Sequence, residues 1–377
     1  MSVEPLNAQH PARKVFRFIE TLAGTPEALE PGRLEERFDE LARELFRWQF
    51  ERNEALHKWC VARGRTPGTV SHWSQIPAVP TAAFKDFEFT CLAPDDRPVI
   101  FHSSGTSAQR PSRHFHNAVS LELYHASLLP WFKRHLTISA PGGGARPHLL
   151  SLTPTRMLAP HSSLVHMLEV VRSEACSLDS WFSGGVRDDH SWALDPDKVY
   201  TWLNRYAVLN QPVIVTGTAF NFVHLVDWMI SRDVRVQLPP GSAVMETGGY
   251  KGRSRSLPQA ELHVLITERL GTPPERIVCE YGMCELSSQA YDRVLGDASK
   301  PRRFQFPPWA RTRVVSSEDG REVAEGLAGL LQIFDLANAF SVLAVQTEDL
   351  VVRRGDGFEL IGRAEVAEPR GCSLLPT

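Results

Sequence analysis

The residues best suited to chemistry lie in short loops that follow apolar runs of the sequence. The first loop comes directly after the run "PVIFH" and consists of Ser103, Ser104, Gly105, Thr106 and Ser107. Hydroxyl groups and backbone N–H groups around a glycine can bind phosphate oxygens. The spacing differs from that of a Walker A loop, GxxxxGK[ST]. Taken alone, the stretch could equally be an ordinary serine-rich turn.

Acidic residues follow two later apolar runs. Glu285 comes after "VCEYGM", where a carboxylate could hold Mg²⁺ against phosphate oxygens. The alternative is a helix N-terminal acid that stabilises the helix dipole. Asp349 follows "LAVQTE" and could accept hydrogen bonds from ribose hydroxyls, while Arg363 could pair with it or meet phosphate. The alternative for these two is an exposed ion pair of little energetic value.

A thiol, Cys372, stands near the end of the sequence in "RGCSLLPT". The six cysteines form no CxxC pair, and no Cys or His cluster has zinc spacing, so neither disulfides nor a zinc site are predicted. The other five are expected to be buried as small hydrophobic side chains. A terminal segment has little core to enter, so Cys372 is either an inert terminal residue or a nucleophile on an extended arm.

The spacing of apolar residues predicts the elements that must position these groups. Residues 12–24 and 32–64 have apolar residues three and four apart, which predicts helices. Beyond about residue 97, short apolar runs alternate with helical patterns, which predicts an α/β fold with largely parallel sheets. Ligands bind such sheets at the carboxyl ends of the strands. The final region predicts a small antiparallel β region with "GDG" as its hairpin turn.

Composition limits the classes of partner. The chain has 377 residues and a net charge of −3, which predicts no general attraction to nucleic acid or to an anionic membrane. It contains no apolar stretch of about 18 residues and no signal-peptide pattern at its start. We therefore expect a cytoplasmic protein without a membrane span.

The order of the loops carries more information than any one of them. A Ser/Thr/Gly loop, then "GG", then "YGxxE", then "EDL" before "GR" resembles the adenylate-forming enzyme superfamily over about residues 70–377. The resemblance implies ATP and Mg²⁺ as cofactors, with Glu285 serving the metal. It also implies a set of nucleotide-binding positions: Ser103, Ser104, Gly105, Thr106, Ser107, Gly248, Gly249, Tyr281, Gly282, Glu285, Asp349 and Arg363.

The stretch "IPAVPTAAFKDF" is similar to two branches of this superfamily, the phenylacetate–CoA ligases and the acyl-protein synthetases of the luminescence fatty-acid reductase complex. A CoA ligase continues past the hinge arginine into a domain with a catalytic lysine, whereas this chain has 14 residues after Arg363 and resembles the synthetase tail in "RGCSLL". The resemblance implies that Cys372 receives the acyl group. It predicts a helical N-terminal region (1–95), an adenylate-forming core (96–362) and a short tail in place of a full C-terminal domain (363–377).

The phosphate loop departs from the superfamily pattern. Ala108 stands where a glycine is usual, and a lysine is missing, with Arg110 and Arg113 the nearby cations. Lys251 in "GGYKG" is the hypothesised replacement, with the two arginines as alternatives, because developing phosphate charge needs a cation.

The predicted function is ATP-dependent activation of a fatty or aromatic acid as acyl-adenylate, then transfer to Cys372 for delivery to a partner protein. Thr218, Phe220 and Phe222 are the expected substrate-binding residues, although such aromatic residues are equally ordinary in a core. Nine peptide steps from Arg363 to Cys372 span about 30 Å when extended. Two alternatives stay open: an adenylating enzyme that acylates CoA, an amine or a carrier while Cys372 is idle, and a non-catalytic nucleotide-binding scaffold.

Overall fold

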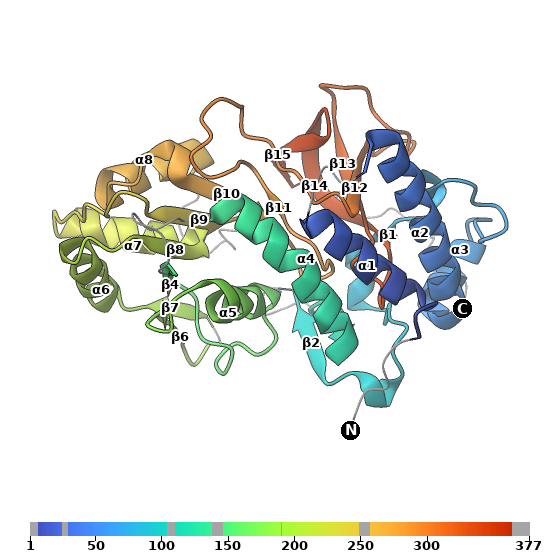
Figure 1. Cartoon of the computed structure of the whole chain (residues 1–377), viewed down its shortest axis with the longest axis horizontal. Coiled ribbons are helices and arrows are strands. Elements are labelled where there is room, and N and C mark those ends of the chain that lie inside the picture. The colour runs from blue at the N-terminus through green and yellow to red at the C-terminus, as the bar shows by residue number, and fades with distance from the viewer. Residues whose placement is uncertain are drawn as a thin grey trace. The chain divides into compact units, whose positions relative to one another are not determined.

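The computed structural model of the chain describes residues 7–24, 29–103, 110–137, 146–189, 191–248 and 257–363 (Figure 1). The chain divides into two compact units. Unit 1 comprises residues 1–130, 283–290 and 303–377, and unit 2 comprises residues 131–282 and 291–302. The predicted division of the chain into three regions, with boundaries after residues 95 and 362, stays a prediction.

Unit 1 begins with the predicted helical region, which is confirmed. Its helices are α1 (Pro11–Gly24), α2 (Pro31–Arg52) and α3 (Glu54–Val61). In α2 the expected stripe is buried at Phe38, Leu41 and Leu45. The helical pattern is interrupted at Asn53, whose backbone is extended (φ −109°, ψ 99°) and whose side chain accepts a hydrogen bond from the Leu56 N–H. Asparagine favours this capping role over a helix interior, so one predicted helix becomes two.

The main sheet of unit 1 has five strands. Its strand order is β1 (Val79–Pro80), β14 (Ala344–Arg354), β13 (Ala328–Asp335) and β12 (Ala310–Val315), and β15 (Gly357–Arg363) pairs with β14. All of these pairs are antiparallel except β1 with β14. The predicted antiparallel region is therefore confirmed. Gly355 turns the β14–β15 hairpin with φ +60°, which favours glycine.

Smaller elements complete unit 1. Strands β2 (Val99–His102) and β3 (Arg113–His116) form an antiparallel pair, where the sequence pattern predicted the first strand of a parallel sheet. Short 3₁₀ helices are η1 (Trp73–Gln75), η2 (Thr81–Lys85) and η3 (Pro94–Asp96). Helix α4 (Ala118–Leu136) follows β3, and the division between the units falls within it at Pro130.

Unit 2 contains the predicted parallel sheet. The six strands lie in the order β11 (Ala290–Tyr291), β10 (Ile277–Tyr281), β9 (Ala243–Thr247), β8 (Val213–Thr218), β4 (His148–Ser151) and β5 (Trp181–Phe182). Every neighbouring pair from β10 to β5 is parallel. All residues of β8, β9 and β10 are buried, as expected for parallel strands covered on both faces.

Helices of unit 2 pack against this sheet. They are α5 (Ser163–Ala175), α6 (Pro196–Val208), α7 (Ala219–Ser231), α8 (Gln259–Leu270) and the 3₁₀ helix η4 (Pro274–Arg276). Residues of α6, α7 and α8 share one core with strand residues, among them the alternating Val213 and Val215 of β8 and Val244 of β9. A hairpin of β6 (Gly184–Val186) and β7 (Trp192–Leu194) lies beside α7. The mixed α/β fold with helical N-terminal region is thus as predicted.

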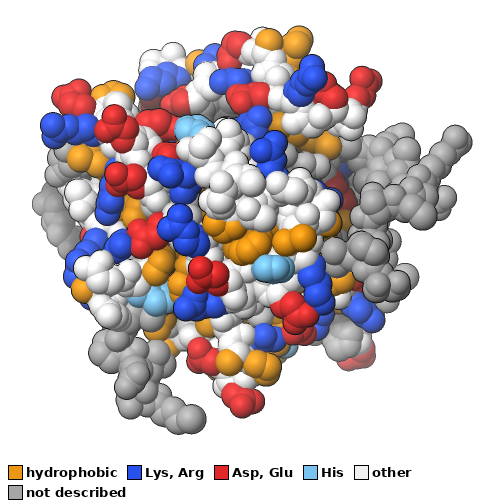
Figure 2. Space-filling model, turned by 90° about the vertical axis from the view of Figure 1, so that its right-hand side faces the viewer, with side chains coloured by type: hydrophobic (Ala, Val, Ile, Leu, Met, Phe, Trp, Pro, Cys, Tyr) orange, Lys and Arg blue, Asp and Glu red, His pale blue; other side chains and the backbone are white. Residues whose placement is uncertain are grey.

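The surface of the described chain mixes charges of both signs. On the face in Figure 2, basic and acidic side chains are interspersed. Ion pairs one turn apart occur along α2, such as Arg37–Glu40 and Arg43–Asp39. Among the described residues, no helix combines the length and hydropathy that a membrane crossing requires.

Candidate functional site

The predicted phosphate loop begins and ends at fixed points in unit 1. Ser103 follows β2, and its Oγ accepts a hydrogen bond from the Ser112 N–H over 2.9 Å. The Ser103 N–H donates in turn to the Ser112 carbonyl over 3.2 Å. This pair closes the base of the loop next to the β2–β3 hairpin. The other loop residues, Ser104, Gly105, Thr106 and Ser107, lie outside the described residues.

Glu285 lies next to the base of that loop. Ser112 Oγ donates a hydrogen bond to Glu285 Oε1 over 2.5 Å, and Glu285 is buried with 5% of its surface exposed. Ser112 therefore links Ser103 to the proposed metal ligand, so two motifs far apart in the sequence converge within unit 1. A carboxylate has two oxygens, so one can accept from Ser112 while the other faces a cation. The residues present thus fit a Mg²⁺ site.

A buried polar network holds the segment that carries Glu285. Asn338 Nδ2 donates to the Glu285 carbonyl over 2.9 Å, and Asp335 accepts from the Ser287 N–H over 2.9 Å and from Ser288 Oγ over 2.7 Å. Asp335 has no exposed surface, and burial raises its pKa to about 6 despite these hydrogen bonds. The network fixes residues 285–288 against the turn after β13.

Histidine 114 supports the same segment from β3. Its Nδ1 lies 2.6 Å from the Cys284 carbonyl oxygen, which requires the N–H tautomer at that nitrogen. Desolvation by burial lowers its pKa to about 4, although the hydrogen bonds to Cys284 and Asn338 act in the opposite direction. His114 is therefore a neutral donor at neutral pH, and it is buried together with Phe115 and His116.

Of the two arginines near the loop, one already has a partner. Arg113 Nη1 lies 2.8 Å from Glu88 Oε1, and the other oxygen of Glu88 pairs with Arg97 over 2.6 Å. Arg110 is exposed. Lys251 and Gly249 lie outside the described residues, as does Cys372.

Asp349 and Arg363 occupy directly paired positions on β14 and β15. Arg363 Nε lies 3.6 Å from Asp349 Oδ1, with 80% of the arginine side chain and 16% of the aspartate side chain exposed. The ion pair between Asp349 and Arg363, which the sequence offered as an alternative to nucleotide binding, is present. Because the arginine is so exposed, the pair contributes little stability.

In unit 2 the predicted positions gather at one edge of the parallel sheet. Thr218 ends β8 opposite Thr247 of β9, and Thr247 is opposite Glu280 of β10. Gly248 and Tyr281 therefore follow at the carboxyl ends of adjacent strands, where ligands bind in such sheets. Thr247 Oγ1 donates to Glu280 Oε2 over 2.5 Å, and burial raises the pKa of Glu280 to about 7. Gly282 is exposed just beyond β10.

Helix α7 starts at this edge with a capping box. The Asn221 N–H donates a hydrogen bond to Thr218 Oγ1, and the Thr218 N–H donates one to Asn221 Oδ1. The cap fixes the direction of the helix and the placement of two predicted substrate residues. Phe222 is fully buried in the core. Phe220 is half-buried and makes an edge contact with His224, with ring centroids 4.5 Å apart.

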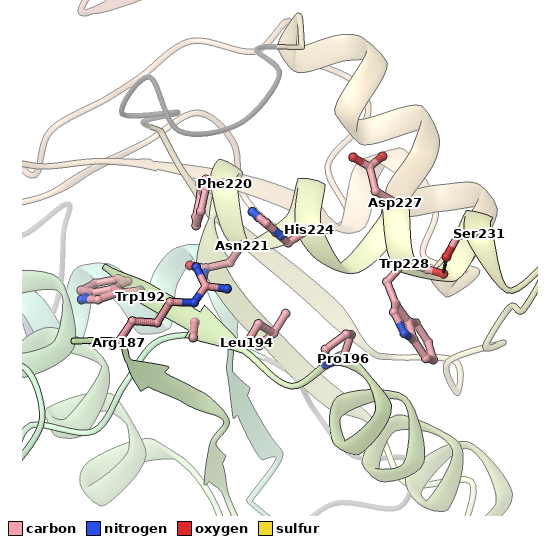
Figure 3. Close-up of a pocket in the computed structure, with 11 residues that line it drawn as sticks. Arg187, Trp192, Leu194, Pro196, Phe220, Asn221, His224, Asp227, Trp228 and Ser231 are labelled. Atoms are coloured by element: carbon pink, nitrogen blue, oxygen red, sulfur yellow. Dashed lines mark hydrogen bonds between the residues drawn. The ribbon is translucent and has the colours of Figure 1, made fainter. Parts of the chain in front are cut away.

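Phe220 lines a pocket of about 370 Å³ between α7 and the β6–β7 hairpin (Figure 3). Arg187 extends from β6–β7 toward Asn221 and brings a positive charge to the pocket. The apolar part of the wall comes from Trp192, Leu194 and Trp228. The lining combines these apolar walls with one basic residue, Arg187, and one acidic residue, Asp227, and such a cavity suits an organic ligand of modest size that carries a polar group. Neither Arg187 nor Ser112 was predicted, because no local pattern marks either residue.

Comparisons with known proteins identify the family of the chain. Residues 22–376 match the family described as acyl-protein synthetase, LuxE. A long-chain-fatty-acid–luciferin-component ligase of Aliivibrio fischeri is 21% identical over 354 residues, which cover 89% of this chain and 86% of that protein.

Solved structures show the same fold. An open conformation of 2-hydroxyisobutyryl-CoA ligase in complex with 2-HIB-AMP and CoA has a TM-score of 0.63 at 12% identity, covering 87% of this chain and 69% of that one. The postadenylation state of that ligase with 2-HIB-AMP has a TM-score of 0.62 at 13% identity, covering 89% and 69%. The predicted adenylate-forming fold is confirmed. Because the family match extends over nearly the whole sequence, the chain belongs to the acyl-protein synthetase (LuxE) family and is a ligase.

Proposed function

We propose that this protein activates a carboxylic acid with ATP and transfers the acyl group to its own Cys372, from which a partner protein receives it. The observation that carries the proposal is the family match, which runs from residue 22 to residue 376 and so includes the phosphate loop, the Glu285 segment and Cys372. The closed base of the phosphate loop beside Glu285 supports it further.

In the first half-reaction, a carboxylate oxygen attacks the α-phosphate of ATP, and pyrophosphate leaves. Ser103 to Ser107 bind phosphate oxygens, and Gly248, Gly249, Tyr281 and Gly282 line the base pocket. Asp349 accepts hydrogen bonds from the ribose, with Arg363 at the hinge. Glu285 would hold Mg²⁺, which would supply positive charge to the phosphate oxygens. The protein's own task is to align the reacting oxygens and to hold fixed donors around them.

In the second half-reaction, the thiolate of Cys372 attacks the carbonyl carbon of the acyl-adenylate. The carbon–oxygen bond to AMP breaks, AMP leaves with the electron pair, and a thioester forms. A free thiol has a pKa near 8.5, so only a few per cent is ionised at neutral pH and nearby groups must favour the thiolate. Arg370 lies two residues before Cys372 and carries the appropriate charge, while Glu368 opposes it.

The acid is proposed to bind in the pocket beside Phe220. Its apolar walls at Trp192 and Leu194 suit a hydrocarbon or aromatic body, and Arg187 suits a carboxylate. The similar protein of Aliivibrio fischeri is named for long-chain fatty acids, which favours a fatty acid as the substrate class.

Pyrophosphate exchange with a panel of fatty and aromatic acids tests the first half-reaction and identifies the acid. Acylation of the chain with a labelled acid then tests the second half, in the wild type and in Cys372→Ser. We expect Cys372→Ser to keep exchange and lose the labelled thioester, whereas Cys176→Ser, which removes a buried cysteine, keeps both.

Other outcomes separate the alternatives. Full activity of Cys372→Ser with CoA or an amine as acceptor would replace the thioester route with a small-molecule ligase. Absence of exchange with every acid would favour a nucleotide-binding scaffold.

A further inference from the structure

Three side chains that can each ligate a metal ion meet inside unit 2. Glu246 lies on β9, Cys279 lies directly opposite it on β10, and His263 lies on α8. All three are buried, with 2–6% of their surfaces exposed. Cys279 Sγ lies 2.6 Å from Glu246 Oε2 and 3.7 Å from His263 Nε2, and that nitrogen lies 3.7 Å from Glu246 Oε2. All three ligand atoms lie within 4.8 Å of one another.

The cluster buries negative charge that the described side chains leave without a full positive partner. Within the described ranges, Glu246 pairs with no lysine or arginine, and the imidazole of His263, which carries a charge only when protonated, lies 3.7 Å from Glu246 Oε2. Asp292 lies alongside and accepts a hydrogen bond from the Cys279 N–H, but Arg302 pairs with it over 2.5 Å. Buried carboxylates are costly unless they are paired or coordinate a metal.

The geometry suits a tetrahedral ion with mixed ligands. At metal–ligand distances of about 2.0–2.3 Å, neighbouring ligand atoms in a tetrahedral zinc site lie about 3.4–3.6 Å apart. Both distances to His263 Nε2 are close to this value. The sulfur and the carboxylate oxygen are closer, and binding would widen that pair by about 1 Å. Gln259, one turn before His263, lies 2.6 Å from Cys279 Sγ through its side-chain amide and could supply a fourth ligand through its oxygen.

We propose that Glu246, His263 and Cys279 bind one Zn²⁺ ion in a structural site separate from the catalytic Mg²⁺. A thiolate, an imidazole and a carboxylate together match the ligand preference of zinc rather than that of magnesium. Coordination displaces the thiol proton to solvent and forms a metal–sulfur bond.

The position of the site indicates what the ion would do. Glu246 precedes Gly248 by two residues, and Cys279 precedes Tyr281 by two residues. The ion would therefore join α8 to the two strands whose carboxyl ends carry the proposed adenine-pocket residues. The inference does not depend on the proposed reaction, since metal content is measured without turnover.

The test uses untagged full-length protein with Cys372→Ser, so that the terminal thiol cannot bind metal. The protein is stripped with a chelator, loaded with Zn²⁺ or Co²⁺ and freed of excess metal by gel filtration. We expect one zinc per chain by mass spectrometry. The cobalt form should show a thiolate-to-metal charge-transfer band and the visible bands of a four-coordinate ion.

Variants in that background locate the site. Adding Cys279→Ser should abolish the charge-transfer band, and adding His263→Gln should weaken zinc affinity by about 100-fold or more. Adding Cys176→Ser, another buried cysteine of unit 2, should change neither. Failure of the background protein to retain zinc or to show the cobalt band would overturn the proposal. This measurement does not depend on the folding of any variant of the three proposed ligands. A band that persists in Cys279→Ser would also overturn it.

Discussion

Ser112 Oγ donates a 2.5 Å hydrogen bond to Glu285 Oε1, although the two residues are 173 positions apart in the sequence. The bond is buried, and the Ser112 backbone also fixes Ser103 at the start of the phosphate loop. A fixed hydrogen bond orients the carboxylate before any ligand arrives, so no reorganisation is needed when phosphate charge develops. Ser112 is thus a positioning residue for the proposed metal ligand.

Loss of this carboxylate should impair adenylation more than loss of its hydrogen-bond donor. We expect Glu285→Gln to lower the rate of pyrophosphate exchange by about 100-fold or more, and Ser112→Ala to lower it by about tenfold. Ser341→Ala is the matched control, because it removes another buried hydroxyl of unit 1, one that donates to the Phe89 carbonyl. A Glu285→Gln protein with wild-type exchange would exclude the metal role of this residue.

Two phenylalanines of α7 should separate binding from stability. Phe220 lines the pocket, whereas Phe222 is fully buried. Phe220→Ala should raise the KM for the acid by about tenfold through lost apolar contact and leave the free energy of unfolding nearly unchanged. Phe222→Ala should lower that free energy by about 3–5 kcal/mol because it leaves a cavity. Urea unfolding and exchange kinetics measure both. An unchanged KM in Phe220→Ala would remove the pocket from the acyl site.

The cation that replaces the missing lysine can be identified by comparing two variants. Arg113 already pairs with Glu88, so its charge is partly neutralised. We therefore expect Lys251→Ala to slow pyrophosphate exchange by about 100-fold and Arg113→Ala to slow it only slightly. The opposite ranking would assign the role to the arginine. Equal, wild-type rates in both variants and in Arg110→Ala would show that none of the three cations serves the phosphates.

Much of the fold could be predicted because its signals are local. Strands β8 and β9 begin with the apolar runs "VIV" and "AVM", as expected for strands buried on both faces. The "GDG" hairpin follows from the backbone freedom of Gly355. The break between α2 and α3 was missed, because the apolar spacing continues past Asn53. The capping preference of asparagine is a weak local signal, and here the contact of its side chain with the Ser341 carbonyl reinforces it.

Contacts between distant segments could not be predicted from spacing. The phosphate loop and Glu285 were recognised by the order of their motifs, but the Ser112 bridge between them has no sequence signal. Glu246, His263 and Cys279 are 16 or 17 positions apart, far from any zinc pattern, so the sequence predicted no metal cluster. Strand pairing and the face of α8 bring them together, and both depend on the finished sheet.

Two buried groups of unit 1 should give opposite pH dependences of stability. His114 has its pKa lowered from 6.5 to about 4, so between these values the folded chain binds fewer protons than the unfolded chain. Its contribution to stability is therefore lost as the pH falls through that window. Asp335 has its pKa raised from 3.8 to about 6, so the folded chain binds more protons there, and its contribution is lost as the pH rises.

Urea unfolding of the wild type, His114→Gln and Asp335→Asn between pH 4 and 6.5 separates the two effects. The wild-type advantage over His114→Gln should grow by about 3 kcal/mol as the pH rises across this range. The advantage over Asp335→Asn should shrink by about 3 kcal/mol between pH 4 and 6. Because the two slopes oppose each other, the wild type alone should show little pH dependence from this pair. If the wild-type advantage changed with pH in the same direction over both variants, burial could not be the cause of the pKa shift in at least one of the two groups.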